Sequence, residues 1–230
     1  MRVAALVTGG KDSALALYKA MNEGYNVAHL VTMIPKRQDS WMFHYPNIHL
    51  SSLFAEAVDI PHVKAETSGE KEAELEDLKK ILARLDIEGV VSGAIASQYQ
   101  KSRIDQICKE LGLKSITLLW QQNPQKLLDE LLSLKMETII VGVYAHGFTQ
   151  EWLGKKIDKV AVTALEELNR KYQVSIVGEG GEYETLVLDA PFFKKKIKLV
   201  EVQKVWEKNS GYLLVRKAVL VGKLVPKKVY

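Results

Sequence analysis

The chain has 230 residues, of which 47% are apolar and 26% charged, and its formal net charge is +4 at pH 7. That length and apolar content predict a sizeable buried core in one large domain, or in a main domain with a smaller appendage. No run of eighteen apolar residues occurs, which excludes a membrane-spanning helix. Cys108 is the single cysteine, which excludes an internal disulfide and a multi-cysteine zinc site and favours a cytoplasmic protein.

Short β-rich runs and segments with helical spacing alternate along the first 145 residues. The expected strands are residues 3–8, 27–34, 62–66, 89–95, 115–119 and 138–144, and the expected helices are residues 13–22, 48–58, 70–85, 98–111 and 124–134. The first apolar run is too short for a signal peptide and is expected to be a buried strand. This alternation predicts an α/β fold, an open parallel sheet with right-handed crossovers and helices on both faces.

The pattern changes after about residue 146. A helix is expected at residues 158–172, followed by a Gly/Glu-rich turn at residues 178–182. Strands are expected at residues 185–188, 197–206 and 212–221, the last two joined by a hairpin turn at residues 207–211. We predict a smaller C-terminal α+β unit here, and divide the chain into residues 1–135 and 136–230.

Basic residues are concentrated at the C-terminal end. The segment from Phe192 onward contains eleven Lys or Arg residues and two acidic residues. Such asymmetry can mark a docking surface for RNA or an RNA-bound protein. The simpler interpretation, which we favour from the sequence, is a solvated hairpin studded with lysines.

The segment Thr8-Gly9-Gly10-Lys11-Asp12-Ser13 follows the first expected strand and opens the first expected helix. A glycine pair at this place lets backbone N–H groups converge on an anion, and the helix N-terminus adds partial positive charge. The hydroxyls of Thr8 and Ser13 can donate hydrogen bonds, and Lys11 can neutralise phosphate charge. Asp12 is expected to hold Mg²⁺ or to cap the helix.

This loop fits neither of two common nucleotide-binding motifs. A Walker A loop would need a glycine at Ala5 and Ser or Thr at Asp12, and the spacing of a dinucleotide fingerprint is absent. The hexapeptide instead resembles the S-G-G-x-D-S loop of the PP-loop ATP pyrophosphatases, with Thr8 in place of Ser. That resemblance implies cleavage of ATP between its α and β phosphates.

Five further segments carry a closer resemblance. They are Trp41-Met42-Phe43-His44 with Pro46-Asn47, the run from Glu66 to Glu72, the run from Gly93 to Arg103, Trp152-Leu153-Gly154, and the run from Gly178 to Thr185. Together they resemble the diphthine–ammonia ligase family in its short archaeal form, without the extra C-terminal domains of eukaryotic relatives. The resemblance covers nearly the whole chain. It implies that ATP, diphthine on translation elongation factor 2 and ammonium give diphthamide, AMP and pyrophosphate, with Mg²⁺ assisting.

The resemblance and the residues together give a set of candidate site residues. The catalytic candidates are Lys11, Asp12, Glu182 and Glu184, with Asp12 as the metal ligand. The cofactor-binding candidates are Thr8, Gly9, Gly10, Lys11, Asp12, Ser13, Met33 near the adenine, Gly93, Ser97 and Arg103. The substrate-binding candidates are His44, Asn47, Tyr99, Gln100, Glu179, Glu182, Tyr183 and Glu184.

Three carboxylates on the Gly/Glu-rich turn repel one another unless a cation is present. Diphthine carries a trimethylammonium group and the second substrate is ammonium, so we expect Glu179, Glu182 and Glu184 to attract one or both cations. Tyr183 or Trp41 is expected to stack on the quaternary ammonium. The alternative is a solvated acidic loop.

Two other functions stay open from the sequence. One is a non-catalytic ATP-binding sensor, which would not need Lys11-Asp12-Ser13 or the glutamate turn. The other is a PP-loop ligase acting on tRNA or a small carboxylic acid. Cys108 lacks a partner cysteine and is expected to be a buried filler, so ammonia is taken free or from a partner. A homodimer is compatible with the sequence, which does not decide the oligomeric state.

Overall fold

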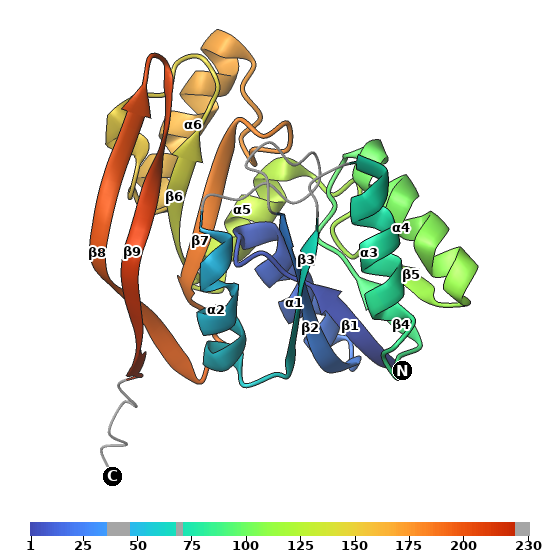
Figure 1. Cartoon of the computed structure of the whole chain (residues 1–230). Helices are drawn as coiled ribbons and strands as arrows, with labels where there is room; N and C mark the ends of the chain where they lie inside the picture. The colour runs from blue at the N-terminus through green and yellow to red at the C-terminus, as the bar shows by residue number, and fades with distance from the viewer. Residues whose placement is uncertain (36–46, 68–70, 224–230) are drawn as a thin grey trace.

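The computed structural model describes residues 1–35, 47–67 and 71–223, and it contains two sheets with helices between them and on one outer side (Figure 1). Trp41, His44 and the residues 68–70 therefore lie outside the described residues. The first sheet is parallel and has the order β3-β2-β1-β4-β5. The second is antiparallel and has the order β7-β6-β9-β8.

The parallel sheet confirms the predicted α/β architecture. Its strands are β1 (Arg2–Leu6), β2 (Asn26–Pro35), β3 (His62–Thr67), β4 (Gly89–Val91) and β5 (Lys114–Ile116). In β1, Val3 and Ala5 pack into one core cluster and Ala4 into another, so the strand is buried on both faces. The strand order reverses between β1 and β4, which creates a crevice at their carboxyl ends.

Helices cover both faces of this sheet. They are α1 (Lys11–Asn22), α2 (Ser51–Val58) after the 3₁₀ turn Ile48–Leu50, α3 (Lys71–Leu82), α4 (Gln98–Leu111) and α5 (Pro124–Ser133). Leu78 of α3 and Ile107 of α4 share the core cluster of the outer face. Apolar residues of α1, α2 and α5 share the larger cluster that also includes the second sheet, so these three helices lie between the sheets.

Local caps explain where several helices begin. The Ser97 side chain accepts a hydrogen bond from the Gln100 N–H and starts α4, and Asn123 caps α5 just before Pro124. Asp158 caps α6 (Lys159–Tyr172) in the same way through the Ala161 N–H. These capping residues are visible in the sequence, which is why the predicted helix limits lie close to the observed ones.

The second unit consists of β6 (Glu137–Val143), the 3₁₀ turn Gln150–Trp152, α6, β7 (Tyr183–Asp189), β8 (Lys195–Glu207) and β9 (Ser210–Gly222). The expected strand at residues 138–144 was counted in the parallel alternation, and this part of the prediction was wrong. It forms β6, which pairs antiparallel with β7 and β9. An apolar run of this kind fits a parallel or an antiparallel sheet equally well. The choice depends on the partner strands β7 and β9, which come later in the chain.

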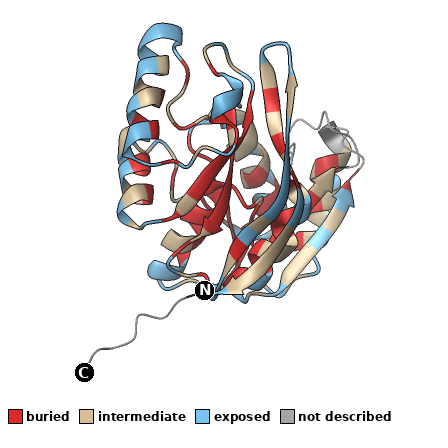
Figure 2. Cartoon of the chain, turned by 90° about the vertical axis from the view of Figure 1, so that its left-hand side faces the viewer, coloured by how far each residue is buried: buried red, intermediate tan, exposed pale blue. Residues whose placement is uncertain are grey.

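Figure 2 shows the buried residues concentrated on the strands and on the inner sides of the helices. One core cluster contains Val3 of the parallel sheet, Leu17 of α1 and Leu186 of the antiparallel sheet. The two units therefore share a core, and the boundary at residues 135 and 136 stays a prediction. Cys108 is buried in the other cluster, as expected for a filler.

Several basic residues near the C-terminal end have acidic partners elsewhere in the chain. Lys195 pairs with Glu56 at 3.2 Å, Lys223 pairs with Asp189 at 2.5 Å, and Lys196 pairs with Glu137. These ion pairs link the β8–β9 hairpin to α2, β6 and β7, so part of its basic excess is neutralised within the molecule.

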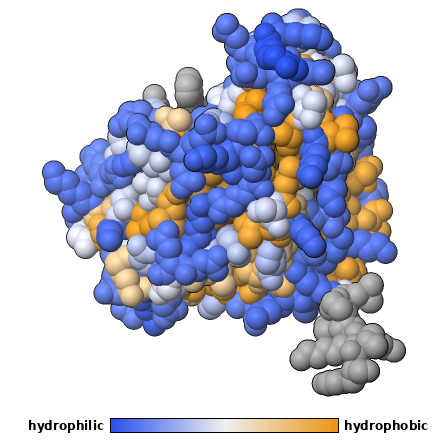
Figure 3. Space-filling view, turned by 180° about the vertical axis from the view of Figure 1, so that it is seen from behind, coloured by the Kyte–Doolittle hydropathy of each residue, from blue (hydrophilic) through white to orange (hydrophobic). Residues whose placement is uncertain are grey.

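The molecular face in Figure 3 is largely hydrophilic, with apolar side chains gathered in smaller patches among the charged ones. Among the helices in the described ranges, none is long and apolar enough to cross a membrane.

Candidate active site

A cavity of about 690 Å³ opens at the carboxyl ends of β1 and β4, where the second unit meets the parallel sheet. It is lined by the loop between β1 and α1, the end of β2, the loop between β4 and α4 with the first turns of α4, the end of β6, and the turn that leads into β7. The predicted residues among the lining are Thr8, Gly10, Lys11, Asp12, Ser13, Met33, Gly93, Ser97, Tyr99, Gln100, Glu179, Tyr183 and Glu184.

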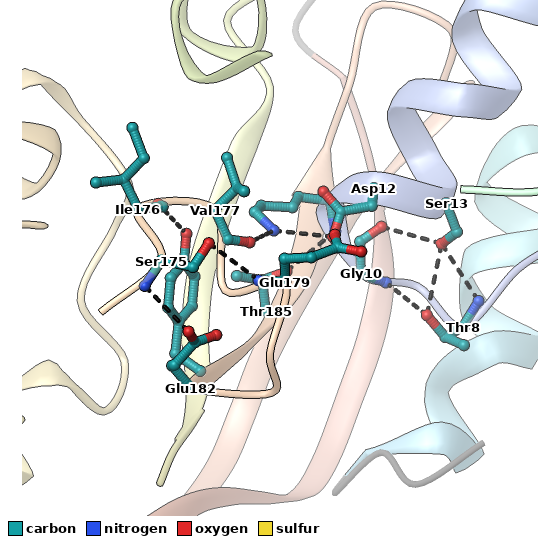
Figure 4. Close-up of polar contacts among 12 residues, drawn as sticks. Thr8, Gly10, Asp12, Ser13, Ser175, Ile176, Val177, Glu179, Glu182 and Thr185 are labelled. Atoms are coloured by element: carbon teal, nitrogen blue, oxygen red, sulfur yellow. Dashed lines mark hydrogen bonds and ion pairs between the residues drawn. The ribbon is translucent and has the colours of Figure 1, made fainter. Parts of the chain in front are cut away.

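The loop between β1 and α1 is held in shape by its own hydroxyl groups (Figure 4). The Gly10 N–H donates to Thr8 Oγ1 at 3.3 Å, Ser13 Oγ donates to the Gly10 carbonyl at 3.1 Å, and the Thr8 N–H donates to Ser13 Oγ at 3.3 Å. Gly9 has φ +91°, which a residue with a side chain rarely adopts. The loop thus ends at the first turn of α1, where N–H groups lack intrahelical acceptors and can bind an anion.

Lys11 is almost fully buried, with 4% of its surface exposed, although it starts α1 beside the cavity. Its ammonium donates to the Val177 carbonyl at 2.5 Å and to the Asp12 carboxylate at 2.9 Å. It also lies 5.3 Å from the centre of the Tyr183 ring. Burial lowers the pKa of Lys11, but the hydrogen bond and charge of Asp12, together with Tyr183 and Glu184, outweigh it and raise the pKa overall, so the ammonium stays charged.

Gly93 brings the loop after β4 against the start of α1. A Cβ at this position would lie 2.8 Å from both the carbonyl carbon of Asp12 and the nitrogen of Ser13. Both of these are backbone atoms, so they cannot move aside easily. Only glycine therefore allows the two loops to form one continuous wall of the cavity.

Two of the three glutamates fix the shape of the turn. Glu182 accepts hydrogen bonds from the N–H groups of Ser175 at 3.0 Å and Gly180 at 2.7 Å. Glu179 Oε1 accepts from the N–H groups of Ala96 at 2.8 Å and Ser97 at 2.6 Å, at the beginning of α4. Burial raises the pKa of Glu179, and these two N–H groups oppose the shift. Glu179 thereby joins the turn to the opposite wall.

Glu184 behaves differently from its two neighbours. Its side chain lines the cavity, and within the described part of the chain no hydrogen bond or ion pair engages its carboxylate. Burial raises the pKa of Glu184 to about 7, with Asp12 adding to the shift and Lys11 opposing it. Tyr183 is buried, and its hydroxyl donates to the Ile176 carbonyl at 2.7 Å.

Several predicted residues do not line the cavity. Asn47 is fully buried and its amide pairs with β9, donating to the Leu213 carbonyl at 2.8 Å and accepting from the Val215 N–H at 2.9 Å. The Arg103 guanidinium lies 3.5 Å from the centre of the Tyr99 ring, so it contacts a lining residue. Gly9 and Glu182 shape the neighbouring segments, and His44 lies outside the described residues.

Three lining residues with polar or aromatic side chains escaped the prediction. Thr185 Oγ1 accepts from the Lys11 N–H at 3.0 Å and joins β7 to the start of α1. Tyr144 lines the cavity from the end of β6, and Ser92 lines it from the end of β4. The available signal was an aromatic or polar residue at the limit of an expected strand, which holds for Tyr144 and Thr185, whereas Ser92 lies inside the expected strand 89–95. Groups of three or more metal-ligating side chains do not occur in the described ranges.

Two models of the same protein family match this chain, one over its N-terminal part and one over its C-terminal part. A model described as the diphthamide synthase N-terminal domain matches residues 1–115, and one described as the diphthamide synthase C-terminal domain matches residues 123–221. Among solved structures, a predicted subunit of tRNA methyltransferase from Methanocaldococcus jannaschii aligns over 83% of this chain and 98% of its own, with 18% identity and a TM-score of 0.46. That similarity is too low to support a functional argument.

Three relatives named diphthine–ammonia ligase illustrate the similarity. The Bos taurus protein is 37% identical over 86% of this chain and 82% of its own length, and the Homo sapiens protein is 36% identical with the same coverage. The Schizosaccharomyces pombe protein is 36% identical over 95% of this chain, which spans only 40% of that relative. These matches confirm the resemblance seen in the sequence, and the chain belongs to the diphthamide synthase family.

Proposed function

We propose that this chain is a diphthine–ammonia ligase, which uses ATP and ammonium to amidate the diphthine carboxylate of translation elongation factor 2 and releases AMP and pyrophosphate. The observation that carries the proposal is the cavity built by the loop from Thr8 to Ser13 and the turn before β7, in a chain of this family. The names of the relatives, which include diphthine–ammonia ligases covered over most of their length, support the same activity.

The chemistry of the cavity walls fits ATP. The first turn of α1 offers N–H groups for phosphate oxygens, and the buried charge of Lys11 adds a fixed positive potential beside them. Val31 and Met33 give the cavity an apolar part at the end of β2, which suits the adenine base. Asp12 would hold Mg²⁺, since this ion commonly uses one or two carboxylates together with phosphate oxygens.

The first step of the proposed reaction is the transfer of AMP to the diphthine carboxylate. This step depends on positioning the nucleotide and neutralising its phosphate charge more than on acid–base chemistry. A carboxylate resists attack by ammonia because its leaving group would be oxide, and transfer of AMP supplies a better leaving group. In our proposal the loop and Lys11 orient the nucleotide and stabilise the charge that develops on its phosphates. Glu179 and Glu182 keep the turn in place over the loop, so the cavity stays closed on that side.

In our proposal, each of the two units binds a different substrate. We propose that residues 1–135 bind the nucleotide and that residues 136–230 bind the modified elongation factor, with the reaction taking place in the cytoplasm. The sensor and the tRNA or small-acid ligase that the sequence left open gain no support from the names of the relatives.

The test combines the chain with ATP, Mg²⁺, ammonium and elongation factor 2 that carries diphthine. We expect conversion of the diphthine carboxylate to an amide, read by mass spectrometry of the modified peptide, only when all four are present. Replacing the elongation factor by tRNA should leave ATP uncleaved. ATP cleavage with tRNA and none with the elongation factor would overturn the proposed substrate.

A further inference from the structure

The three glutamates around the turn do not share one role. Both carboxylate oxygens of Glu182 accept hydrogen bonds from main-chain N–H groups. One oxygen of Glu179 accepts hydrogen bonds from two N–H groups of the opposite cavity wall. Glu184 alone among them presents a carboxylate to the cavity with no hydrogen bond or ion pair from the described residues. We propose that Glu184 is the ammonium-binding residue of this active site and accepts the proton that ammonium loses when it attacks.

This inference rests on the proposed function and assigns one substrate to one side chain. Its first support is position. Glu184 precedes Thr185, whose hydroxyl accepts the Lys11 N–H at 3.0 Å, so the carboxylate is carried on the strand that contacts the start of α1. The Val187 N–H also donates to the Gly9 carbonyl at 2.9 Å, which fixes β7 against the same loop. Glu184 also lines the same cavity as Lys11 and Asp12, so a nucleophile held by Glu184 would lie in the cavity proposed to hold the nucleotide.

The second support is the neighbouring tyrosine. Gly142 of β6 pairs with Glu184 of β7, so their Cβ positions point to the same face of the sheet. A Cβ at Gly142 would lie 2.7 Å from the Tyr144 hydroxyl oxygen, which shows that the hydroxyl occupies the space beside Glu184. Burial raises the pKa of Tyr144, and Glu184 raises it further, so the hydroxyl keeps its proton. A carboxylate and a neutral hydroxyl together offer acceptors to a small cation.

The same chemistry distinguishes ammonium from the trimethylammonium group of diphthine. Ammonium donates hydrogen bonds and needs acceptors, whereas a quaternary ammonium has no donors and prefers open aromatic faces. The Tyr183 ring already has the Lys11 ammonium 5.3 Å from its centre. Glu184 therefore suits ammonium, and the raised pKa of its carboxyl, about 7, makes it a competent proton acceptor near neutral pH.

The proposed step balances as follows. Ammonium gives one proton to the Glu184 carboxylate and keeps the electron pair on nitrogen. That pair forms a bond to the acyl carbon of the substrate adenylate, and the bond from this carbon to the AMP oxygen breaks, with its electrons leaving on AMP. The second proton passes from nitrogen to water, and Glu184 returns its own proton to solvent.

The test uses Glu184→Gln, which keeps the shape and removes the charge, with Glu167→Gln on the exposed side of α6 as the matched control. Adenylation is read separately from amidation by diphthine-dependent exchange of labelled pyrophosphate into ATP, which needs no ammonium. We expect Glu184→Gln to retain this exchange and to lose about 100-fold or more in kcat/KM for ammonium. Hydroxylamine, which is uncharged near neutral pH, should restore turnover to the variant as a hydroxamate product.

Each outcome decides between the proposals. Normal ammonium kinetics in Glu184→Gln would overturn the role of Glu184 while leaving the ligase activity intact. Loss of exchange in a folded variant would overturn it too, because Glu184 would then act on the nucleotide step. Absence of exchange in the unaltered chain would instead contradict the proposed function. Should Glu184→Gln fail to fold, Glu184→Asp must raise the KM for ammonium, and an unchanged KM would refute the inference.

Discussion

At the scale of single residues, the side chains of the site are held by main-chain groups from distant parts of the chain. Lys11 and Asp12 were recognised from their place after the first strand, and both line the cavity. One partner of the Lys11 ammonium is the Val177 carbonyl, 166 residues away, and that contact cannot be read from a local motif. For the same reason the main-chain partners of Glu179, 82 and 83 residues away, were not foreseen.

Glu184 should reduce the stability of the protein at neutral pH. Its folded pKa is about 7 and its usual value 4.5, so the folded state binds the proton more tightly than the unfolded chain does. The contribution of Glu184 to the free energy of unfolding is therefore greatest at low pH and declines as the pH rises from 4.5 to about 7.

We accordingly expect Glu184→Gln to be more stable than the unaltered chain by up to about 3 kcal/mol above pH ~7, with the difference shrinking towards pH ~4.5. Urea denaturation across this range measures it, and Glu167→Gln serves as the control. A stability difference that did not change with pH would contradict the raised pKa.

Lys11→Met should damage both folding and adenylation. The change leaves the Val177 carbonyl and the Asp12 carboxylate without their buried partner, which costs about 3 kcal/mol. Lys19→Met on the same helix removes a more exposed ammonium paired with Glu130, and should cost less than about 1 kcal/mol. Thermal unfolding and pyrophosphate exchange would measure the two effects, and equal losses in the two variants would count against a special role for Lys11.

At the scale of elements, the predicted helices agree with the observed ones best where caps are present. Helix α4 spans Gln98–Leu111, the same residues as predicted, because Ser97 caps it and Gly112 in the left-handed region ends it. Strand β4 was expected to run to residue 95 but ends at Val91, since the following residues form the cavity loop instead of pairing. Apolar residues that line a site and apolar residues of a strand look alike in the sequence.

Gly93→Ala should separate the two loops that form the cavity wall. The added methyl group would lie 2.8 Å from backbone atoms of Asp12 and Ser13, so the start of α1 must shift. We expect a loss of about 1–3 kcal/mol in stability and little remaining adenylation. Gly222→Ala is the control, because a methyl group there has nothing within 4 Å. Full activity in Gly93→Ala would show that the wall tolerates movement.

At the scale of the whole molecule, the site exists because the second unit closes over the first. The Val187 N–H bonds to the Gly9 carbonyl, Glu179 bonds to the start of α4, and Thr185 bonds to the Lys11 N–H. The sequence predicted an α/β unit with a parallel sheet and a second α+β unit, but it wrongly counted residues 138–144 among the parallel strands. It could not predict this closure, because contacts between distant segments depend on how the sheets pack and leave no periodic pattern.

The central claim is that this cavity holds ATP for cleavage between its α and β phosphates. The direct measurement is turnover of ATP labelled at the α-phosphate, with diphthine-bearing elongation factor 2 and ammonium present, followed by separation of the nucleotides. Our account predicts that the label appears in AMP, in amounts equal to the amide formed. Label accumulating in ADP, or amide formed without any AMP, would contradict it.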